Sequence, residues 1–290
     1  MILKLHRHQT HAFTLIELLV VISIIALLIG ILLPALGAAR TAARQMKNTT
    51  QLRGIHQGMF TYAQENKGYY PGLDSSGQPE GGNGAVAHTT DTNSTYRTPS
   101  FGTHPLRRLA IMMESNYFPP EYVLAPGDNA KELPDANDPF PNANVGVNNY
   151  SYAMSDIHLQ PNGTAWTAGT TYLPSGRGLE WRDTANTSAI VLSDRAIRDS
   201  GVTVANVTPG FEDYHSIWTE EASQEWRGGV QRNDGSSTFS SEAGGFTTQY
   251  ANGSINDDDN IFGRTEVDAS NYEFSARMVS GHPNQSLTVQ

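Results

Sequence analysis

The chain has 290 residues and a mass of 31.6 kDa, which suits one or two folded units. It contains no cysteine, and this excludes a disulfide framework, a thiol nucleophile and a thiolate metal site. The net charge is −10 at pH 7, and from residue 48 onward 14 basic residues face 28 acidic ones. Phosphate backbones would repel so acidic a region, so the composition argues against nucleic acid as a partner.

The N-terminal region contains an apolar stretch long enough to cross a bilayer. It runs over 24 residues from Phe13 to Leu36, and Leu18–Leu33 has no charge and only Ser23 as a polar side chain. As a helix it would span roughly 36 Å, against about 30 Å for a bilayer core. Lys4 and Arg7 precede it and provide the positive flank that stays cytoplasmic. We therefore expect a single inner-membrane pass with the N-terminus in the cytoplasm and the head exported.

Three interpretations of this stretch compete. An ordinary signal peptide would be cut near Ala35-Leu36-Gly37. The apolar core of such a signal has roughly 7 to 15 residues, and the apolar run here is longer. A plain transmembrane anchor fits the length, but it gives no reason for Glu17, since a carboxylate at the edge of the membrane is costly. A third interpretation accounts for Glu17 as well.

The string AFTLIELLVV, residues 12–21, resembles the class III signal of type IV prepilins and type II secretion pseudopilins. The resemblance implies that prepilin peptidase cuts between Ala12 and Phe13 and that Phe13 is then N-methylated. It also implies that Glu17 acts in filament assembly, where its carboxylate would neutralise the Phe13 amine of a neighbouring subunit and fix the register. Pro34 stands where many members of the family have a helix-kinking proline, whereas Ala12 replaces their usual glycine. The alternative for Glu17 is an acid near the interface that reaches water.

The same resemblance implies a structural protein and not an enzyme. Its function would be that of a subunit of a type IV pilus-like or type II secretion pseudopilus filament. Its partners would be copies of itself, other pilin-like subunits, prepilin peptidase and inner-membrane platform proteins. It would lie in the inner membrane before assembly and in a periplasmic or cell-surface filament afterwards. The alternative is an anchored or secreted surface domain that binds a ligand or partner without polymerising. The sequence contains no nucleophile elbow, zinc-protease motif or phosphate-binding loop, so we expect no catalytic residues.

We expect an α+β fold in which a long N-terminal transmembrane and amphipathic helix packs on an antiparallel β-sheet head, as in the lollipop shape of pilins. Leu52, Ile55, Met59 and Tyr62 recur at spacings of 3, 4 and 3, which predicts one apolar helix face against the head. The expected parts are a leader (1–12), a membrane or filament-core helix (13–36), an amphipathic helix (37–68) and a head (69–290) with a long loop at about 72–104.

Within the head, turn signals and apolar runs predict a short helix, several strands and a hairpin. The helix is expected over Leu106–Tyr117, ended by Pro119 and Pro120, with Leu106, Leu109, Ile111 and Met113 inward. The strands are expected at Asn149–Met154, Ser188–Ser193 and Gly201–Val207, and the hairpin turn at Asp234-Gly235. Asp194-Arg195 is expected to join a local ion-pair or turn network. The order of short fragments through the head resembles that of large pseudopilin-like proteins of planctomycete-type bacteria.

The acidic run at Asn256–Asn260 is the candidate metal site of the head. Asp257, Asp258 and Asp259 supply hard oxygen ligands that suit calcium, although the run lacks the glycine and glutamate of an EF-hand. Major pseudopilins bind calcium in a C-terminal loop, so the resemblance also points here. The alternative is a solvated acidic loop. If calcium binds, chelation should lower the melting temperature of the head.

Overall fold

The computed structural model describes residues 14–73, 105–128, 150–155, 180–184, 186–198, 214–219, 225–249, 255–259, 261 and 278–280. The chain divides into two compact units, Met1–Arg44 and Gln45–Gln290. Helix α1, Leu15–Glu65, contributes to both.

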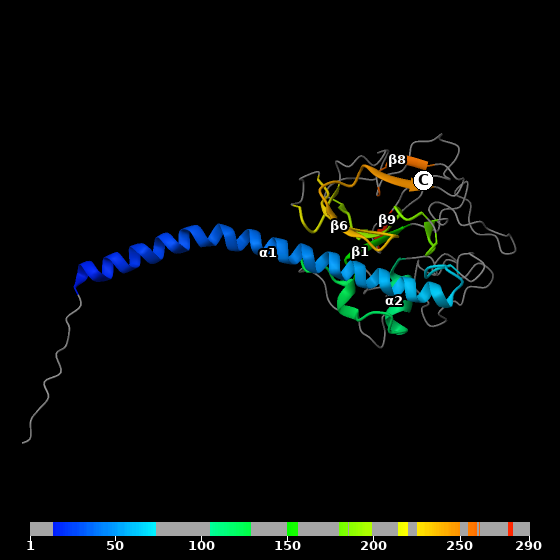
Figure 1. Ribbon diagram of the computed structural model, residues 1–290, viewed down its shortest axis with the longest axis horizontal. Coiled ribbons are helices and arrows are strands. Elements are labelled where there is room, and N and C mark those ends of the chain that lie inside the picture. The colour runs from blue at the N-terminus through cyan, green and yellow to red at the C-terminus, as the bar shows by residue number, and fades with distance from the viewer. Residues whose placement is uncertain are drawn as a thin grey trace, which may run out of the picture. The chain divides into compact units, whose positions relative to one another are not determined.

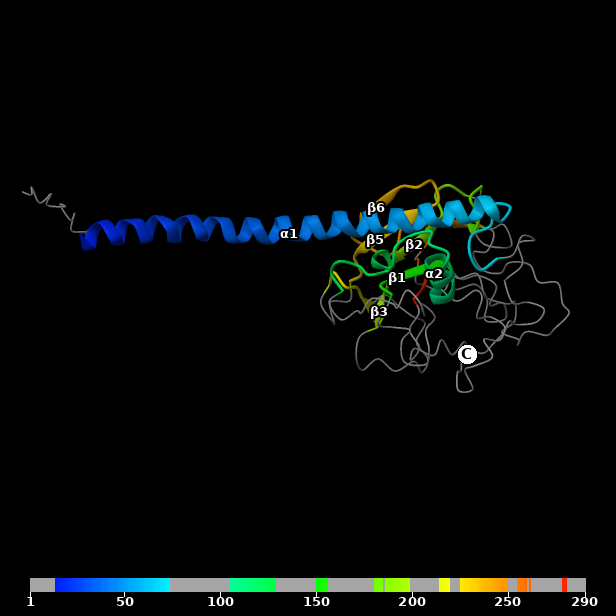
Figure 2. The same cartoon turned by 90° about the horizontal axis from the view of Figure 1, so that it is seen from below.

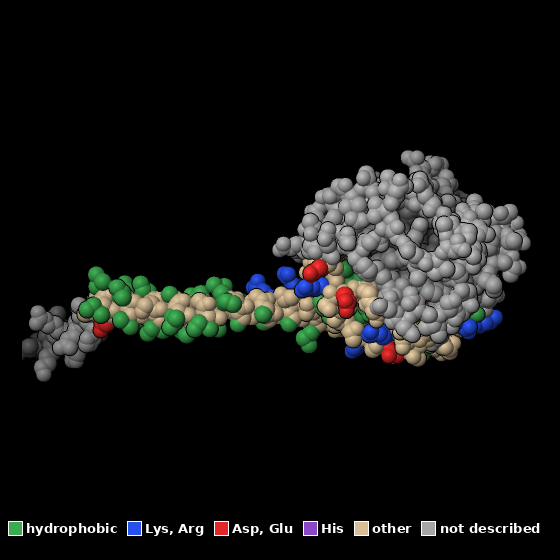
Figure 3. Space-filling view, turned by 90° about the horizontal axis from the view of Figure 1, so that it is seen from above, with side chains coloured by type: hydrophobic (Ala, Val, Ile, Leu, Met, Phe, Trp, Pro, Cys, Tyr) green, Lys and Arg blue, Asp and Glu red, His purple; other side chains and the backbone are tan. Residues whose placement is uncertain are grey.

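In the first unit, α1 is apolar from Leu18 to Leu36 and exposed on all sides there. An 18-residue window of the helix has a mean hydropathy of 3.1, and none of it is buried. The large apolar side chains from Leu15 to Leu36 are 47% to 78% exposed, and Figure 3 shows them covering this part of the helix. Pro34 lies inside the helix without ending it. By length and composition this segment can cross a membrane.

The second unit is built on a five-stranded antiparallel sheet with the order β6-β5-β2-β1-β9. Figure 1 labels β6, β1 and β9 of this sheet. Two pairs of strands, β3 with β4 and β7 with β8, form separate small antiparallel sheets. The strand bounds are β1 Tyr152–Ser155, β2 Ile190–Asp194, β3 Ile197–Arg198, β4 Tyr214–His215, β5 Gly228–Arg232, β6 Ser237–Ser240, β7 Phe246–Gln249, β8 Ile255–Asp259 and β9 Met278–Ser280.

The second half of α1 packs against this sheet, as Figure 2 shows. Leu52, Ile55 and Met59 are completely buried and Tyr62 is 8% exposed, so the predicted apolar face is confirmed. Close approach depends on Gly229 of β5, where a Cβ atom would lie 2.6 Å from Leu52 Cδ1. The α+β fold, with a long N-terminal helix on an antiparallel sheet, is therefore confirmed as pilin-like.

A helical segment covers α1 from the side. It contains α2, Pro105–Glu114, and a short 3₁₀ helix, η2, Pro120–Val123. Leu109 and Met113 are buried as predicted, but Met112 is completely buried where Ile111 was expected, and Ile111 is half-buried. The helix also ends earlier than the prolines predicted, because Asn116 turns left-handed at φ 58° and Tyr117 N–H donates to the Met112 carbonyl.

The predicted strands at 149–154 and 188–193 correspond to β1 and β2, each shifted toward the C-terminus. The Asp234-Gly235 turn joins β5 to β6 and is confirmed, with Gly235 at φ 85°. The predicted strand at 201–207, and the expected loop from residue 74 onward, lie outside the described residues. Asp257–Asp259 belong to strand β8, paired with β7, so the prediction of a loop there was wrong.

We predict that the head needs the second half of α1 to fold. A chain beginning at Ala38 should melt cooperatively, whereas one beginning at Tyr69 should be far less stable. The reason is that Leu52, Ile55 and Met59 are each completely buried, and burial of such a side chain contributes about 1.5 to 3 kcal/mol. Thermal melts followed by circular dichroism decide this. Equal melting temperatures for the two chains would contradict the packing role of α1.

Candidate functional site

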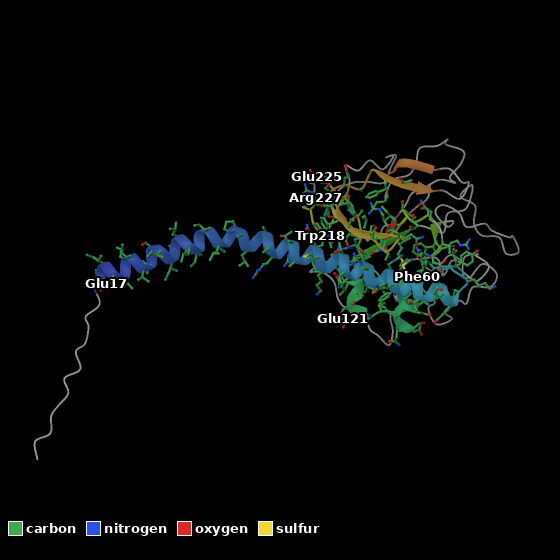
Figure 4. All side chains as sticks on the ribbon, in the orientation of Figure 1. Glu17, Phe60, Glu121, Trp218, Glu225 and Arg227 are labelled. Carbon is green, nitrogen blue, oxygen red and sulfur yellow. The ribbon has the colours of Figure 1, made fainter. Side chains whose placement is uncertain are left out.

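The start of α1 is capped by a reciprocal pair of side chains. Thr14 Oγ1 accepts a hydrogen bond from the Glu17 amide at 3.2 Å. Glu17 Oε2 accepts bonds from the Thr14 amide and hydroxyl, both at 2.8 Å. This is the capping box, in which a threonine and a glutamate three residues later satisfy each other's backbone donors. The T-x-x-E spacing was visible in the sequence, and the cap gives Glu17 a structural role within its own chain. Figure 4 labels Glu17 at the start of α1.

The predicted assembly residues are placed only in part. Ala12 and Phe13 lie outside the described residues, while Glu17 and Pro34 lie on α1. Between them, Ser23 Oγ donates to the Val20 carbonyl at 2.8 Å, so the single polar side chain of the apolar run is satisfied by its own backbone. From Leu18 to Leu36, α1 thus presents an apolar surface that begins just after a capped carboxylate.

A buried carboxylate anchors α1 to the sheet in the second unit. Asp194, at the end of β2, is completely buried. Its Oδ2 accepts bonds from Trp218 Nε1 at 2.7 Å, from the Gly229 amide at 2.7 Å and from Asn48 Nδ2 at 2.8 Å. Its Oδ1 accepts a further bond from Asn48 Nδ2 at 2.9 Å. One side chain therefore joins α1, β2, β5 and the segment that carries Trp218.

Burial raises the pKa of Asp194 to about 6, and the hydrogen bonds from Gly229, Asn48 and Trp218 oppose the rise. Desolvation disfavours the charged form, whereas donors aimed at the carboxylate favour it. The two neighbours expected to join a local ion-pair or turn network have different partners, since the carboxylate of Asp194 accepts hydrogen bonds from Asn48, Trp218 and Gly229. Arg195, which follows the last residue of β2, forms a salt bridge with Asp128 at 3.1 Å.

The polar residues of α1 extend this anchor. Asn48 Oδ1 accepts a hydrogen bond from Tyr152 Oη at 2.8 Å, so the same amide bridges Asp194 and β1. Gln51 Nε2 donates to the Glu121 carbonyl at 2.8 Å and holds the covering segment beside the helix. Sequence analysis missed Asn48 and Gln51, because the partner of Asn48 lies 146 residues away and a polar helix residue is usually exposed.

Asp194 is completely buried and accepts hydrogen bonds from α1, β5 and Trp218, which gives it a structural role in the packing of α1. Among the residues that the structure describes, no three His, Asp or Glu side chains gather as a metal ion would require. A calcium site at Asp257, Asp258 and Asp259 stays a prediction, now for a strand and not for a loop.

Comparison with known proteins identifies the N-terminal segment. Residues 7–33 match the family described as the prokaryotic N-terminal methylation motif. No curated protein and no solved structure matches the chain. The motif is the class III signal of type IV pilins and pseudopilins, and it implies prepilin-type processing, membrane anchoring before assembly and pilin-like assembly. Proteins that carry it are typically structural and not enzymes.

Proposed function

We propose that this chain is a structural subunit of a type IV pilus-like or type II secretion pseudopilus filament. In this proposal prepilin peptidase cuts between Ala12 and Phe13, Phe13 is methylated, and the subunit assembles through its N-terminal helix. The observation that carries the proposal is that the methylation motif at residues 7–33 overlaps an apolar helix with no buried residue in its membrane-length window.

An apolar helix exposed on all sides is unstable in water, so another apolar environment must cover it. Lipid covers it before assembly, and the same helices of neighbouring copies would cover it inside a filament. The head supports this function because it holds the second half of α1 through buried apolar side chains and through the hydrogen bonds of Asp194. A subunit built in this way can be pulled by its head while its apolar half moves from lipid into a filament.

The proposed partners follow from this sequence of events. They are copies of this chain, other pilin-like subunits, prepilin peptidase and the inner-membrane platform proteins that extract subunits. The protein would lie in the inner membrane first and in a periplasmic or surface filament later. A surface domain anchored by the same helix, which binds a partner and never polymerises, is the alternative, and filament formation separates the two.

Processing gives the first test of the proposal. We predict that the mature protein begins at Phe13 and that its N-terminal amine carries a methyl group, because Ala12 is small enough for the peptidase to accept. Mass spectrometry of the N-terminal peptide from membrane extracts measures both. A mature chain that begins at Ala38 would instead identify an ordinary signal peptide and contradict the proposal. An Ala12→Gly variant, which restores the usual residue, serves as the control for cleavage at this bond.

A further inference from the structure

Three basic residues form a ridge along one face of α1 just after the apolar segment. Arg40, Arg44 and Lys47 are spaced four and three residues apart, which places them within an arc of about 60° around the helix. All three are exposed, and no salt bridge joins them to the part of the chain that the structure describes. We call Arg40, Arg44 and Lys47 the basic ridge.

The ridge stands on a cationic helix in an otherwise acidic protein. From Leu18 to Gln64 the chain contains no acid and four basic residues, the ridge and Arg53. From residue 65 to the end, 13 basic residues face 28 acidic ones. The two regions are complementary in charge, but the ridge has no partner of its own among the described residues. A second copy of the chain offers the acidic surface that the ridge lacks.

The covering segment places exposed acids beside α1. Glu121 is exposed, and its carbonyl accepts the bond from Gln51, so Glu121 lies level with Gln51 on the helix. Figure 4 shows Glu121 beside α1. Closer to the C-terminal end of α1, Tyr117 Oη donates to Glu65 Oε2 at 2.5 Å. Glu114, at the end of α2, is also exposed. Neither Glu114 nor Glu121 forms a salt bridge with a described residue. Two exposed acids that are unpaired within the described residues, Glu114 and Glu121, therefore lie on the covering segment beside α1.

We propose that the basic ridge of one copy binds the covering segment of a second copy, at the surface that carries Glu121. The inference rests on the proposed filament and names a contact within it. Gln51 lies 4 residues beyond Lys47 and 11 beyond Arg40, so a copy shifted along the helix axis by about 6 to 17 Å brings the ridge level with Glu121. Gln51 lies on the same face of α1 as the ridge, so the second copy must also be turned about the helix axis until its Glu121 faces the ridge. Parallel helices with that stagger and that rotation make the contact without bending either chain.

Lipid headgroups are the competing partner for such a ridge. The negative surface potential that attracts basic segments belongs mainly to the cytoplasmic leaflet. The ridge follows the membrane segment on the side that the basic leader assigns to export, where this attraction is weaker. A ridge confined to one helix face also fits a single protein neighbour better than a surrounding ring of lipids. We therefore assign the second copy as the occupant.

Disulfide crosslinking tests the contact directly, because the natural chain has no cysteine. Two full-length single-cysteine variants, Arg44→Cys and Glu121→Cys, are co-expressed in cells that assemble the filament and are then oxidised. Each carries one cysteine, so a linked dimer of the two joins different copies. We expect this dimer in the sheared filament fraction. The matched control replaces Arg44→Cys with Ala42→Cys, which is exposed on the opposite side of the helix and should give no dimer with Glu121→Cys.

A third variant separates this inference from the proposed function. Ser23→Cys lies in the apolar run, so its self-linked dimer reports contact between N-terminal helices independently of the ridge. Ser23 dimers without Arg44–Glu121 dimers would overturn the ridge contact and leave the filament standing. Absence of both would overturn the filament proposal and the ridge contact together. A triple variant, Arg40→Gln, Arg44→Gln and Lys47→Gln, tests the lipid alternative. If this variant is lost from membranes, and the Arg44→Cys and Glu121→Cys proteins form no linked dimer, the ridge binds lipid and the proposal is wrong.

Discussion

Replacement of Asp194 by alanine should lower the free energy of unfolding of the head by about 3 kcal/mol or more. The change leaves three buried donors without their acceptor, namely Asn48 Nδ2, Trp218 Nε1 and the Gly229 amide. It also releases α1 from the sheet at the end where the helix enters the head. Urea denaturation of a chain beginning at Ala38 gives the measurement. Glu242→Ala, at an exposed position without a salt bridge to the described residues, is the matched control and should have little effect.

The pH dependence gives the same anchor a second test. The pKa of Asp194 is raised to about 6 in the folded chain, from 3.8. Folding therefore favours the protonated form of Asp194. The contribution of this form to the free energy of unfolding is complete below pH 3.8 and is lost as the pH rises through 6. Relative to Asp194→Asn, which does not titrate, wild type should lose stability between these limits, on the order of 3 kcal/mol. Burial lowers the pKa of His56, which acts with the opposite sign, but it is present in both proteins and cancels in the difference. Parallel pH profiles would contradict a buried, titrating Asp194.

The features that the sequence predicted correctly rest on local patterns. The spacing of Leu52, Ile55 and Met59 predicted the buried face of α1, and Asp234-Gly235 predicted the hairpin, because each rests on neighbours in the chain. The choice between Ile111 and Met112 failed because both are apolar and adjacent, and a short helix does not fix which one turns inward.

Contacts between distant residues could not be predicted. Asn48 and Asp194 are separated by 146 residues, and nothing in either neighbourhood marks the pair. The glycines of β5 likewise do not indicate, from the sequence alone, that α1 packs closely against Gly229. The capping box was different, since Thr14 and Glu17 show it directly. It was missed because the same glutamate already had an explanation in the assembly signal.

Glu17→Leu should abolish or strongly reduce filaments while membrane insertion and cleavage continue. The substitution makes the segment more apolar, so insertion is unharmed, and it lies beyond the cleavage bond between Ala12 and Phe13. What is lost is the carboxylate that would compensate the Phe13 amine of an adjacent copy as a subunit leaves lipid. Immunoblots of membranes establish equal levels and equal processing. The filament yield in the sheared fraction then gives the result.

The capping box requires a control that separates two roles of the same glutamate. Thr14→Val removes the hydroxyl that bonds Glu17 but keeps the carboxylate. Loss of such a cap destabilises the start of a helix by about 1 kcal/mol. We therefore expect the first turn of α1, at Leu15, to fray, and the filament yield to stay close to that of wild type. If Thr14→Val stops assembly as completely as Glu17→Leu, Glu17 acts through the cap of its own helix and not through a neighbouring amine.

The composition of sheared filaments tests the proposed function most directly. Cells that carry the assembly system are sheared, and the filaments are sedimented and analysed by mass spectrometry. We predict that the pellet contains this chain, that it begins at methylated Phe13, and that the Glu17→Leu protein is missing from it. Processed protein that stays in the membrane fraction, with none in the pellet of a strain that assembles filaments from other subunits, would contradict the account and favour the anchored surface domain.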